Sequence, residues 1–205
     1  MPVLIIRVWS FFRHWPLAIR HFNFMPSKAL SAKLARVKIF LCDVDGILTD
    51  GSVFISQAGE MKRFSIQDGL GLKLLQREGI KVGWISNRPS RVTLRRAEEL
   101  KIDFLSQDKS SKVAAAEKIL SRSKLSWANA CYMGDDIVDL CLLTRAGLAI
   151  SVPNGIAEAK NAAHYVTKAP GGFGAVREVV EMILKAQKKW NGLVEEFSSG
   201  RHEKV

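Results

Sequence analysis

From residue 37 onward, short apolar runs alternate with amphipathic stretches, and this alternation limits the chain to few folds. Six runs are rich in apolar and β-branched residues, which is typical of buried strands: 37–42, 82–86, 104–105, 130–133, 148–150 and 165–167. Helices are expected between and after them, at 69–78, 90–100, 110–120, 137–146, 156–162 and 175–190. Strands that alternate with helices form a parallel sheet with helices on both faces. The sequence therefore predicts an α/β fold with a doubly wound, Rossmann-like parallel sheet.

One segment interrupts the alternation. Residues 52–55 and 61–65 have strand character and flank the polar turn Gln57-Ala58-Gly59-Glu60, which indicates a projecting β-hairpin. An isolated hairpin is marginally stable in water, so this one is expected to pack against something. The simplest partner is the same hairpin in other copies of the chain.

The net charge of +11 is unevenly distributed. Residues 1–42 contain seven of the 31 Lys and Arg residues and no Asp or Glu, which leaves 24 basic and 20 acidic residues in the rest of the chain. A mildly basic body suits an anionic small molecule, and it carries no aromatic RNA-binding motif. No nucleic-acid partner is therefore expected.

The first 33 residues form a basic amphipathic leader, which is expected to lie outside a domain at 34–190, with a tail at 191–205. Large apolar residues between positions 3 and 24 are interrupted by Arg13, Arg20 and Pro16, which disfavours a membrane-spanning helix. Two alternatives remain for this segment. It lies in a membrane interface, or Met25 is a second start and residues 1–24 are absent from the native protein.

Three cysteines are present, Cys42, Cys131 and Cys141, and they have no CxxC spacing. The odd number and the apolar surroundings argue against a disulfide framework and against a zinc site. A cytoplasmic location is the natural expectation.

In open parallel sheets, ligands bind beyond the carboxyl ends of the strands. The first such loop begins with Asp43-Val44-Asp45-Gly46, which places two carboxylates directly after an apolar strand. Burying both is unfavourable unless a cation or proton compensates them. Magnesium suits this role because it prefers oxygen ligands and leaves room for a phosphate. The alternative is that both residues serve only as turn or cap residues.

The loops after the second and third strands carry groups that suit a phosphate. Ser86, Asn87 and Arg88 follow the second strand, where a hydroxyl and backbone amides make a phosphate cradle and a guanidinium adds a fork. Lys112 lies near the start of a predicted helix, where it serves either as a solvated surface lysine or as a point charge beside the phosphate.

The fourth loop contains three carboxylates within five residues. Asp135, Asp136 and Asp139 follow Gly134 at a strand-to-helix junction. Acidic residues favour helix N-termini, and this dipole effect accounts for one or two of them. The third suggests that the group completes a metal site.

Taken in order, these motifs resemble the haloacid dehalogenase superfamily of aspartate-nucleophile phosphatases, over about residues 34–190. The resemblance implies that Asp43 attacks phosphorus and that Asp45 protonates the leaving alcohol and then activates water. Splitting phosphoester hydrolysis in this way lets one carboxylate act as acid and then as base. The other implied roles are phosphate or substrate binding by Asp45, Ser86, Asn87, Arg88 and Lys112, Mg²⁺ binding by Asp43, Asp45, Asp135 and Asp136, and support by Asp139.

The hairpin and the segments 67–71 and 171–178 carry a narrower resemblance. They are similar to the capless subfamily of the superfamily that contains 3-deoxy-D-manno-octulosonate 8-phosphate phosphatase, an activity of lipopolysaccharide precursor synthesis. That resemblance implies a homotetramer, with the hairpins packed together and a neighbouring subunit covering the site. It also implies that Asp50, Arg88 and Lys112 face a sugar-acid phosphate.

Three positions depart from the subfamily pattern. Gln67 and Phe173 stand where close members usually have Arg, and Asn87 stands where they have Gly. Losing two guanidinium groups near an acidic substrate favours a changed sugar, such as a nine-carbon ulosonate 9-phosphate.

Two other functions are compatible with parts of the pattern. A non-catalytic tetramerising domain associated with sugar nucleotidyl transfer has no need for the intact carboxylate and lysine cluster. A response-regulator receiver has an acidic strand end, but turnover needs the second carboxylate of the Asp-x-Asp pair, Asp45.

Overall fold

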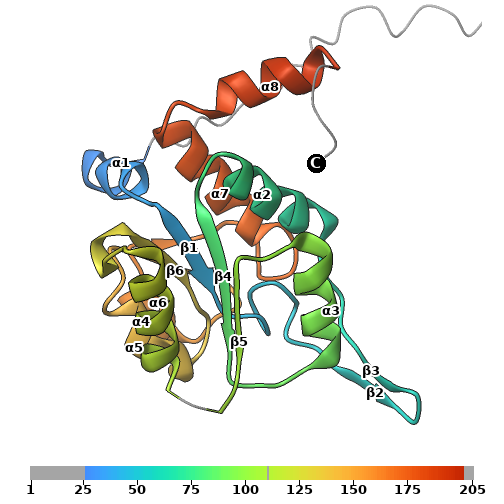
Figure 1. Ribbon diagram of the computed structural model, residues 1–205. Helices are drawn as coiled ribbons and strands as arrows, with labels where there is room; N and C mark the ends of the chain where they lie inside the picture. The colour runs from blue at the N-terminus through green and yellow to red at the C-terminus, as the bar shows by residue number, and fades with distance from the viewer. Residues whose placement is uncertain (1–25, 110, 201–205) are drawn as a thin grey trace, which may run out of the picture.

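The computed structural model describes residues 26–109 and 111–200. Most of the expected leader, the start at Met25 and the last five residues lie outside this part of the chain. Six parallel strands form the sheet, in the order β5-β4-β1-β6-β7-β8 (Figure 1). Their bounds confirm the six predicted strands: β1 Ile39–Cys42, β4 Lys81–Ser86, β5 Phe104–Gln107, β6 Ala130–Met133, β7 Leu148–Ser151 and β8 Tyr165–Val166.

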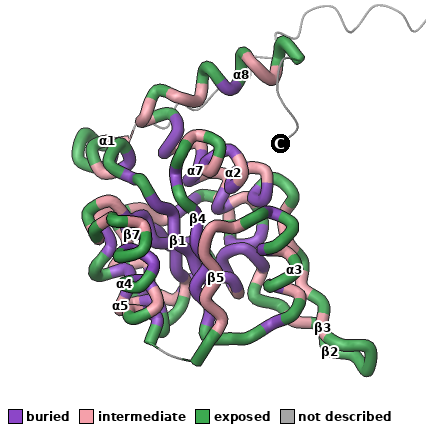
Figure 2. The backbone as a smooth tube through the Cα atoms, in the orientation of Figure 1, coloured by how far each residue is buried: buried purple, intermediate pink, exposed green. Residues whose placement is uncertain are grey.

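Helices cover both faces of the sheet, as the alternation predicts. Successive residues of a strand point to opposite faces, so Phe40 and Cys42 of β1 enter one core while Ile39 and Leu41 enter the other. The first core is closed by α1 Lys28–Ala35, α2 Ile66–Arg77, α3 Arg91–Leu100, α7 Ala175–Ala186 and α8 Trp190–Ser198. The second is closed by α4 Lys112–Ser123, α5 Leu140–Leu143 and α6 Ala157–Ala162. Figure 2 shows the central strand β1 buried between these layers and the edge strand β5 only partly buried.

β1 lies at the point where the order of the sheet reverses. It pairs with β4 on one side and with β6 on the other, both in parallel register. The loops that leave the carboxyl ends of these three strands therefore diverge here, which is the place where ligands bind in open α/β sheets. Two short 3₁₀ helices, η1 Trp127–Asn129 and η2 Ile137–Asp139, flank β6.

The hairpin is present and projects from the sheet (Figure 1). Its strands, β2 Phe54–Ser56 and β3 Gly59–Met61, pair in antiparallel register but are shorter than expected and lie closer to the turn. Gly59 and Glu60, which were expected in the turn, belong to β3. The sequence predicts strand character up to residue 65, but residues 62–65 pair with no strand of the described residues 26–109 and 111–200. Phe54, Ile55 and Met61 are 58%, 82% and 62% exposed, respectively.

Two helices lie outside the domain bounds expected from the sequence. α1 falls mostly in the expected leader, yet Leu30 and Leu34 are buried and Lys33 Nζ donates to the carbonyl oxygen of Gly147 at 2.9 Å. α8 falls in the expected tail, and its Leu193 is buried. The helix predicted at 175–190 ends at Ala186, because Lys188 adopts a left-handed conformation (φ 59°) that breaks it.

Within the described residues, no helix has the length and apolar character needed to cross a membrane. All three cysteines are free thiols, as the absence of CxxC spacing suggests.

Candidate active site at the carboxyl end of the sheet

Asp43 is the first residue after β1 and is only 7% exposed. Its backbone N–H donates to the carbonyl oxygen of Met133 at 3.0 Å, which extends the pairing of β1 with β6 by one step. Gly46 then turns the chain with φ +90°, and a Cβ at this position would lie 2.1 Å from Oδ2 of Asp135. Only glycine allows the first loop to approach the fourth so closely.

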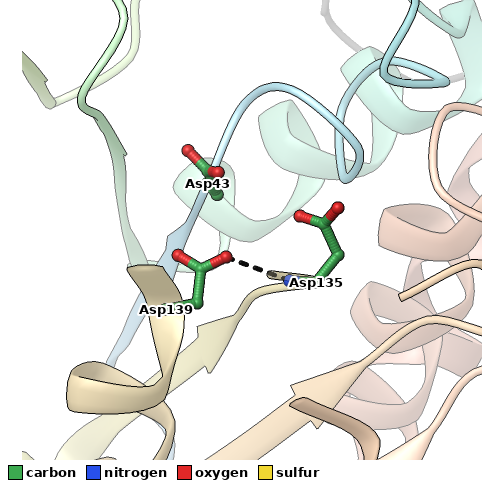
Figure 3. Close-up of side chains that lie close together, drawn as sticks. All are labelled: Asp43, Asp135 and Asp139. Atoms are coloured by element: carbon green, nitrogen blue, oxygen red, sulfur yellow. Dashed lines mark hydrogen bonds between the residues drawn. The ribbon is translucent and has the colours of Figure 1, made fainter. Parts of the chain in front are cut away.

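Three carboxylates from the loops after two strands, β1 and β6, lie close together (Figure 3). One oxygen from each of Asp43, Asp135 and Asp139 lies within 4.8 Å of the others. Within the part of the chain that the structure describes, a single ammonium faces them: Lys112 Nζ lies 3.2 Å from Asp43 Oδ1 and 2.7 Å from Asp139 Oδ1. With all three carboxylates ionised, two negative charges remain unmatched in a buried site.

The pKa values of two of these carboxyls reflect that excess. Burial raises the pKa of Asp43 to about 7, with the Asp139 charge adding to the shift and Lys112 opposing it. Burial also raises the pKa of Asp135 to about 7, and the charges of Asp139 and Asp43 add to it. Such carboxyls hold a proton or a cation at neutral pH.

The donor set fits a divalent cation. Asp135 Oδ1 is buried and has no hydrogen-bond partner, and an unpaired buried oxygen costs free energy unless something binds it. Asp43 Oδ1 has only its ion pair with Lys112 and no well-aligned hydrogen bond. Carboxylate oxygens are hard ligands, which Mg²⁺ and related ions prefer.

Asp139 has a different environment from its two neighbours. It is fully buried, and its carboxylate accepts hydrogen bonds from the Tyr132 hydroxyl at 2.5 Å and from Lys112. It also accepts the backbone N–H groups of Asp135 (3.0 Å) and Asp136 (3.2 Å). With both oxygens occupied, Asp139 shapes the loop and anchors Lys112.

Asp136 is not brought into the group of three. Its side chain is exposed and accepts the backbone N–H of Ile137 at 2.7 Å, where it caps η2. The helix-cap interpretation considered for this loop therefore describes the observed position of Asp136.

Lys112 is buried, unlike a solvated surface lysine. Ser111 caps α4 with its side chain, which sets Lys112 as the first residue of the helix. The residue is 4% exposed, and although burial alone would lower its pKa, Asp43 and Asp139 together raise it. Lys112 thus stays charged beside Asp43.

Asp45 is paired with Lys62, a residue that lies outside the four loop motifs of the sequence. Lys62 Nζ lies 2.7 Å from Asp45 Oδ1 and 3.0 Å from Oδ2, and it also donates to the buried Thr93 hydroxyl at 3.2 Å. The Lys62 side chain has no exposed area. One feature of the sequence indicates this position. Side chains alternate along a strand, so residue 62 is expected on the face opposite the exposed Met61.

Ser86 ends β4 and is 4% exposed. Its hydroxyl accepts the backbone N–H of Arg88 at 3.1 Å, which folds the loop back over the strand end. Asn87 and Arg88 are exposed, and the Arg88 guanidinium donates to Glu60 of β3 at 2.6 Å. Glu60 also accepts from the Ser90 hydroxyl, so two contacts join β3 to this loop.

Gly171 and Gly172 lie directly against the Asp43 loop. A Cβ on Gly171 would lie 1.7 Å from the carbonyl oxygen of Gly46, and Gly172 N–H donates to the carbonyl oxygen of Ile47 at 2.8 Å. The next residue, Phe173, is 56% exposed. The departure from the subfamily pattern at residue 173 therefore lies close to the first loop.

Known proteins are similar to this chain in sequence and fold. Residues 85–179 match the family described as haloacid dehalogenase-like hydrolase. The chain is 35% identical over 161 residues to 3-deoxy-D-manno-octulosonate 8-phosphate phosphatase KdsC of Yersinia pestis, covering 78% of this chain and 86% of that protein. The corresponding enzyme of Haemophilus influenzae is 36% identical, with 78% and 89% covered. The chain belongs to the haloacid dehalogenase-like hydrolases.

Solved structures of such hydrolases resemble the fold closely and contain metal. The phosphatase from Moraxella catarrhalis, in complex with magnesium, phosphate and a KDO molecule, is 39% identical with a TM-score of 0.81, covering 84% of this chain and 99% of that chain. The cobalt-bound form from Haemophilus influenzae is 37% identical with a TM-score of 0.74, covering 77% and 92%. A divalent metal is thus a component of this hydrolase fold.

Proposed function

We propose that the chain is a Mg²⁺-dependent phosphatase that hydrolyses 3-deoxy-D-manno-octulosonate 8-phosphate through an aspartyl-phosphate on Asp43. One observation supports this most directly: Asp43 lies buried among carboxylates that outnumber the single ammonium of Lys112. Such a site needs a cation, and a bound cation would let the site accept a phosphate dianion beside Asp43. The names and coverage of the relatives supply the substrate.

In the first step, an oxygen of Asp43 attacks phosphorus while Asp45 gives a proton to the departing sugar alkoxide. In the second step, Asp45 takes a proton from water, whose oxygen attacks the same phosphorus and releases phosphate, and the Asp43 carboxylate is restored. Lys62 fixes Asp45 in one orientation for both steps through its two short contacts.

The phosphoryl oxygens are assigned to Lys112 and to the loop that starts at Ser86. Lys112 reaches Asp43 from the start of α4, and the Ser86 loop presents a hydroxyl and backbone amides at the neighbouring strand end. Asp43 and Asp135 are the residues that would hold the cation. When bound, Mg²⁺ offsets the repulsion between a carboxylate and a phosphate dianion.

The hairpin supports an assembly of several copies. Its exposed Phe54, Ile55 and Met61 are large apolar residues on a two-stranded ribbon that is marginally stable alone. Packing the ribbons of neighbouring copies would cover them, and we propose a homotetramer built in this way.

A phosphate-release assay with Mg²⁺ tests the function. Eight- and nine-carbon ulosonate phosphates are compared with hexose phosphates and nucleotides, and the eight-carbon acid is expected to be turned over most efficiently. Asp43→Asn should lower kcat by about a thousandfold or more because an amide is a poor nucleophile. A preference for nucleotides, or full activity in Asp43→Asn, would contradict the proposal.

A further inference from the structure

Arg63 lies at the rim of the site and has no role in the steps described above. It follows Lys62, whose side chain turns inward to Asp45, and in an extended segment the next side chain points the opposite way. Its guanidinium carbon lies 3.9 Å from the centre of the Phe173 ring. Nε and Nη2 both lie 3.4 Å from a single oxygen, Oδ2 of Asp50.

These three residues come from segments that build the site. Asp50 belongs to the loop that begins at Asp43, and Phe173 follows Gly172, where a Cβ would lie 2.5 Å from the backbone nitrogen of Asp50. Arg63 leaves the hairpin one residue after the partner of Asp45. The guanidinium therefore lies beside the loop that begins at Asp43, at the edge of the site and not among its buried carboxylates.

Other cations near the carboxylates are more firmly occupied. Lys62 has no exposed side-chain area and Lys112 is buried between two carboxylates. Arg88 is 2.6 Å from Glu60, well within strong ion-pair range. The 3.4 Å contacts of Arg63 are long and share one acceptor, so an incoming anion can replace or extend them.

The aromatic ring adds preorganisation. A guanidinium that rests face-on against a ring keeps its edge, where the N–H donors lie, directed outward. The side chain of Arg63 is 46% exposed, and Nη1 has no hydrogen-bond acceptor among residues 26–109 and 111–200. An exposed edge of this kind matches the two oxygens of a carboxylate.

We infer that Arg63, presented by Phe173 and Asp50, binds the carboxylate of the sugar-acid phosphate and so determines substrate specificity. This inference rests on the proposed function, because it needs a substrate with an acid group apart from its phosphate. It places an arginine at the edge of the site in a chain that has Gln67 and Phe173 where close subfamily members usually have Arg.

The test compares two substrates that differ only in that group, the octulosonate 8-phosphate and its carboxamide. Wild type should prefer the acid, mainly through KM. Arg63→Gln should reduce this preference about tenfold or more, with kcat for the carboxamide within about twofold of wild type. Arg63→Lys should retain part of the preference, and Phe173→Leu should lose part of it because the ring no longer orients the guanidinium.

Arg95→Gln is the matched control, since it removes the same charge from an exposed position of α3 and should leave the preference unchanged. Equal losses on both substrates in Arg63→Gln, or no loss on either, would overturn the role of Arg63 while the phosphatase function stands. A wild type that hydrolyses an aryl phosphate but neither sugar-acid substrate would overturn the proposed substrate, and this inference with it.

Discussion

The Lys62 ammonium lies 2.7 Å from the carboxylate of Asp45, with its side chain wholly buried. The two residues are 17 positions apart and come from the end of the hairpin and the first loop of the site. The hairpin is therefore joined to the group that we propose as acid and base.

Lys62→Met should lower kcat by about a hundredfold, because Asp45 loses the partner that orients it for proton transfer. The pair also contributes to stability, but the Asp45 side chain is 23% exposed, so the cost of removing Lys62 should be smaller than the roughly 3–5 kcal/mol typical of a fully buried pair. Steady-state kinetics and thermal melting should both be measured. Thr93→Val keeps the ion pair and removes only one hydrogen bond, so its kcat should fall far less; equal losses in both variants would contradict the orienting role.

Asp135→Asn should weaken the binding of Mg²⁺ by about tenfold or more, because it replaces a charged oxygen ligand that has no other partner. Asp136→Asn is the matched control, since its carboxylate caps η2 outside the group of three. Titration of activity against Mg²⁺ concentration distinguishes the two variants. A larger loss in Asp136→Asn would restore the ligand role that the sequence suggested for that residue.

The metal-free protein should become less stable as the pH rises. The folded-state pKa values of Asp43 and Asp135 are both about 7, above the ordinary value of 3.8. Raised carboxyl pKa values mean that the folded state binds protons more tightly than the unfolded chain. That contribution is complete below 3.8 and is lost as the pH passes through about 7.

Thermal melting with a chelator, at about pH 5.5 and about pH 8.5, measures this effect, and the melting temperature is expected to fall by at least about 2 °C. Added Mg²⁺ should raise the melting temperature more at the higher pH, where both carboxylates are ionised. The double variant Asp43→Asn with Asp135→Asn should lose most of this pH dependence. Identical Mg²⁺ effects at the two pH values would argue against a cation site at these carboxylates.

Ile55→Lys should dissociate the proposed assembly, because it places a charge on the most exposed large apolar residue of the hairpin. Light scattering after size-exclusion chromatography gives the molar mass. Leu94→Lys changes an exposed apolar residue of α3 and serves as the control. An unchanged mass in Ile55→Lys, or an equal change in Leu94→Lys, would move the interface away from the hairpin.

The sequence by itself determined the sheet and its helices, because strand and helix periodicities follow from which face of each element is buried. It also located Asp43, Lys112 and Asp135 at strand or helix ends, where a parallel sheet brings loops together. It did not predict the packing of α1 and α8, since their apolar residues gain partners only when α7 and the sheet are in place.

Only the tertiary structure decided how the carboxylates divide their roles. The sequence alone does not distinguish the three aspartates of this loop, Asp135, Asp136 and Asp139. In the structure, Asp139 accepts hydrogen bonds from Tyr132, from Lys112 and from two backbone amides. Asp136 caps a helical turn, and Asp135 keeps an unpaired oxygen. The pairing of Lys62 with Asp45, and of Arg63 with Phe173, was also invisible, because each joins residues that are distant along the chain. Such contacts depend on which side chains become buried near one another in the folded chain, and no local sequence pattern predicts that.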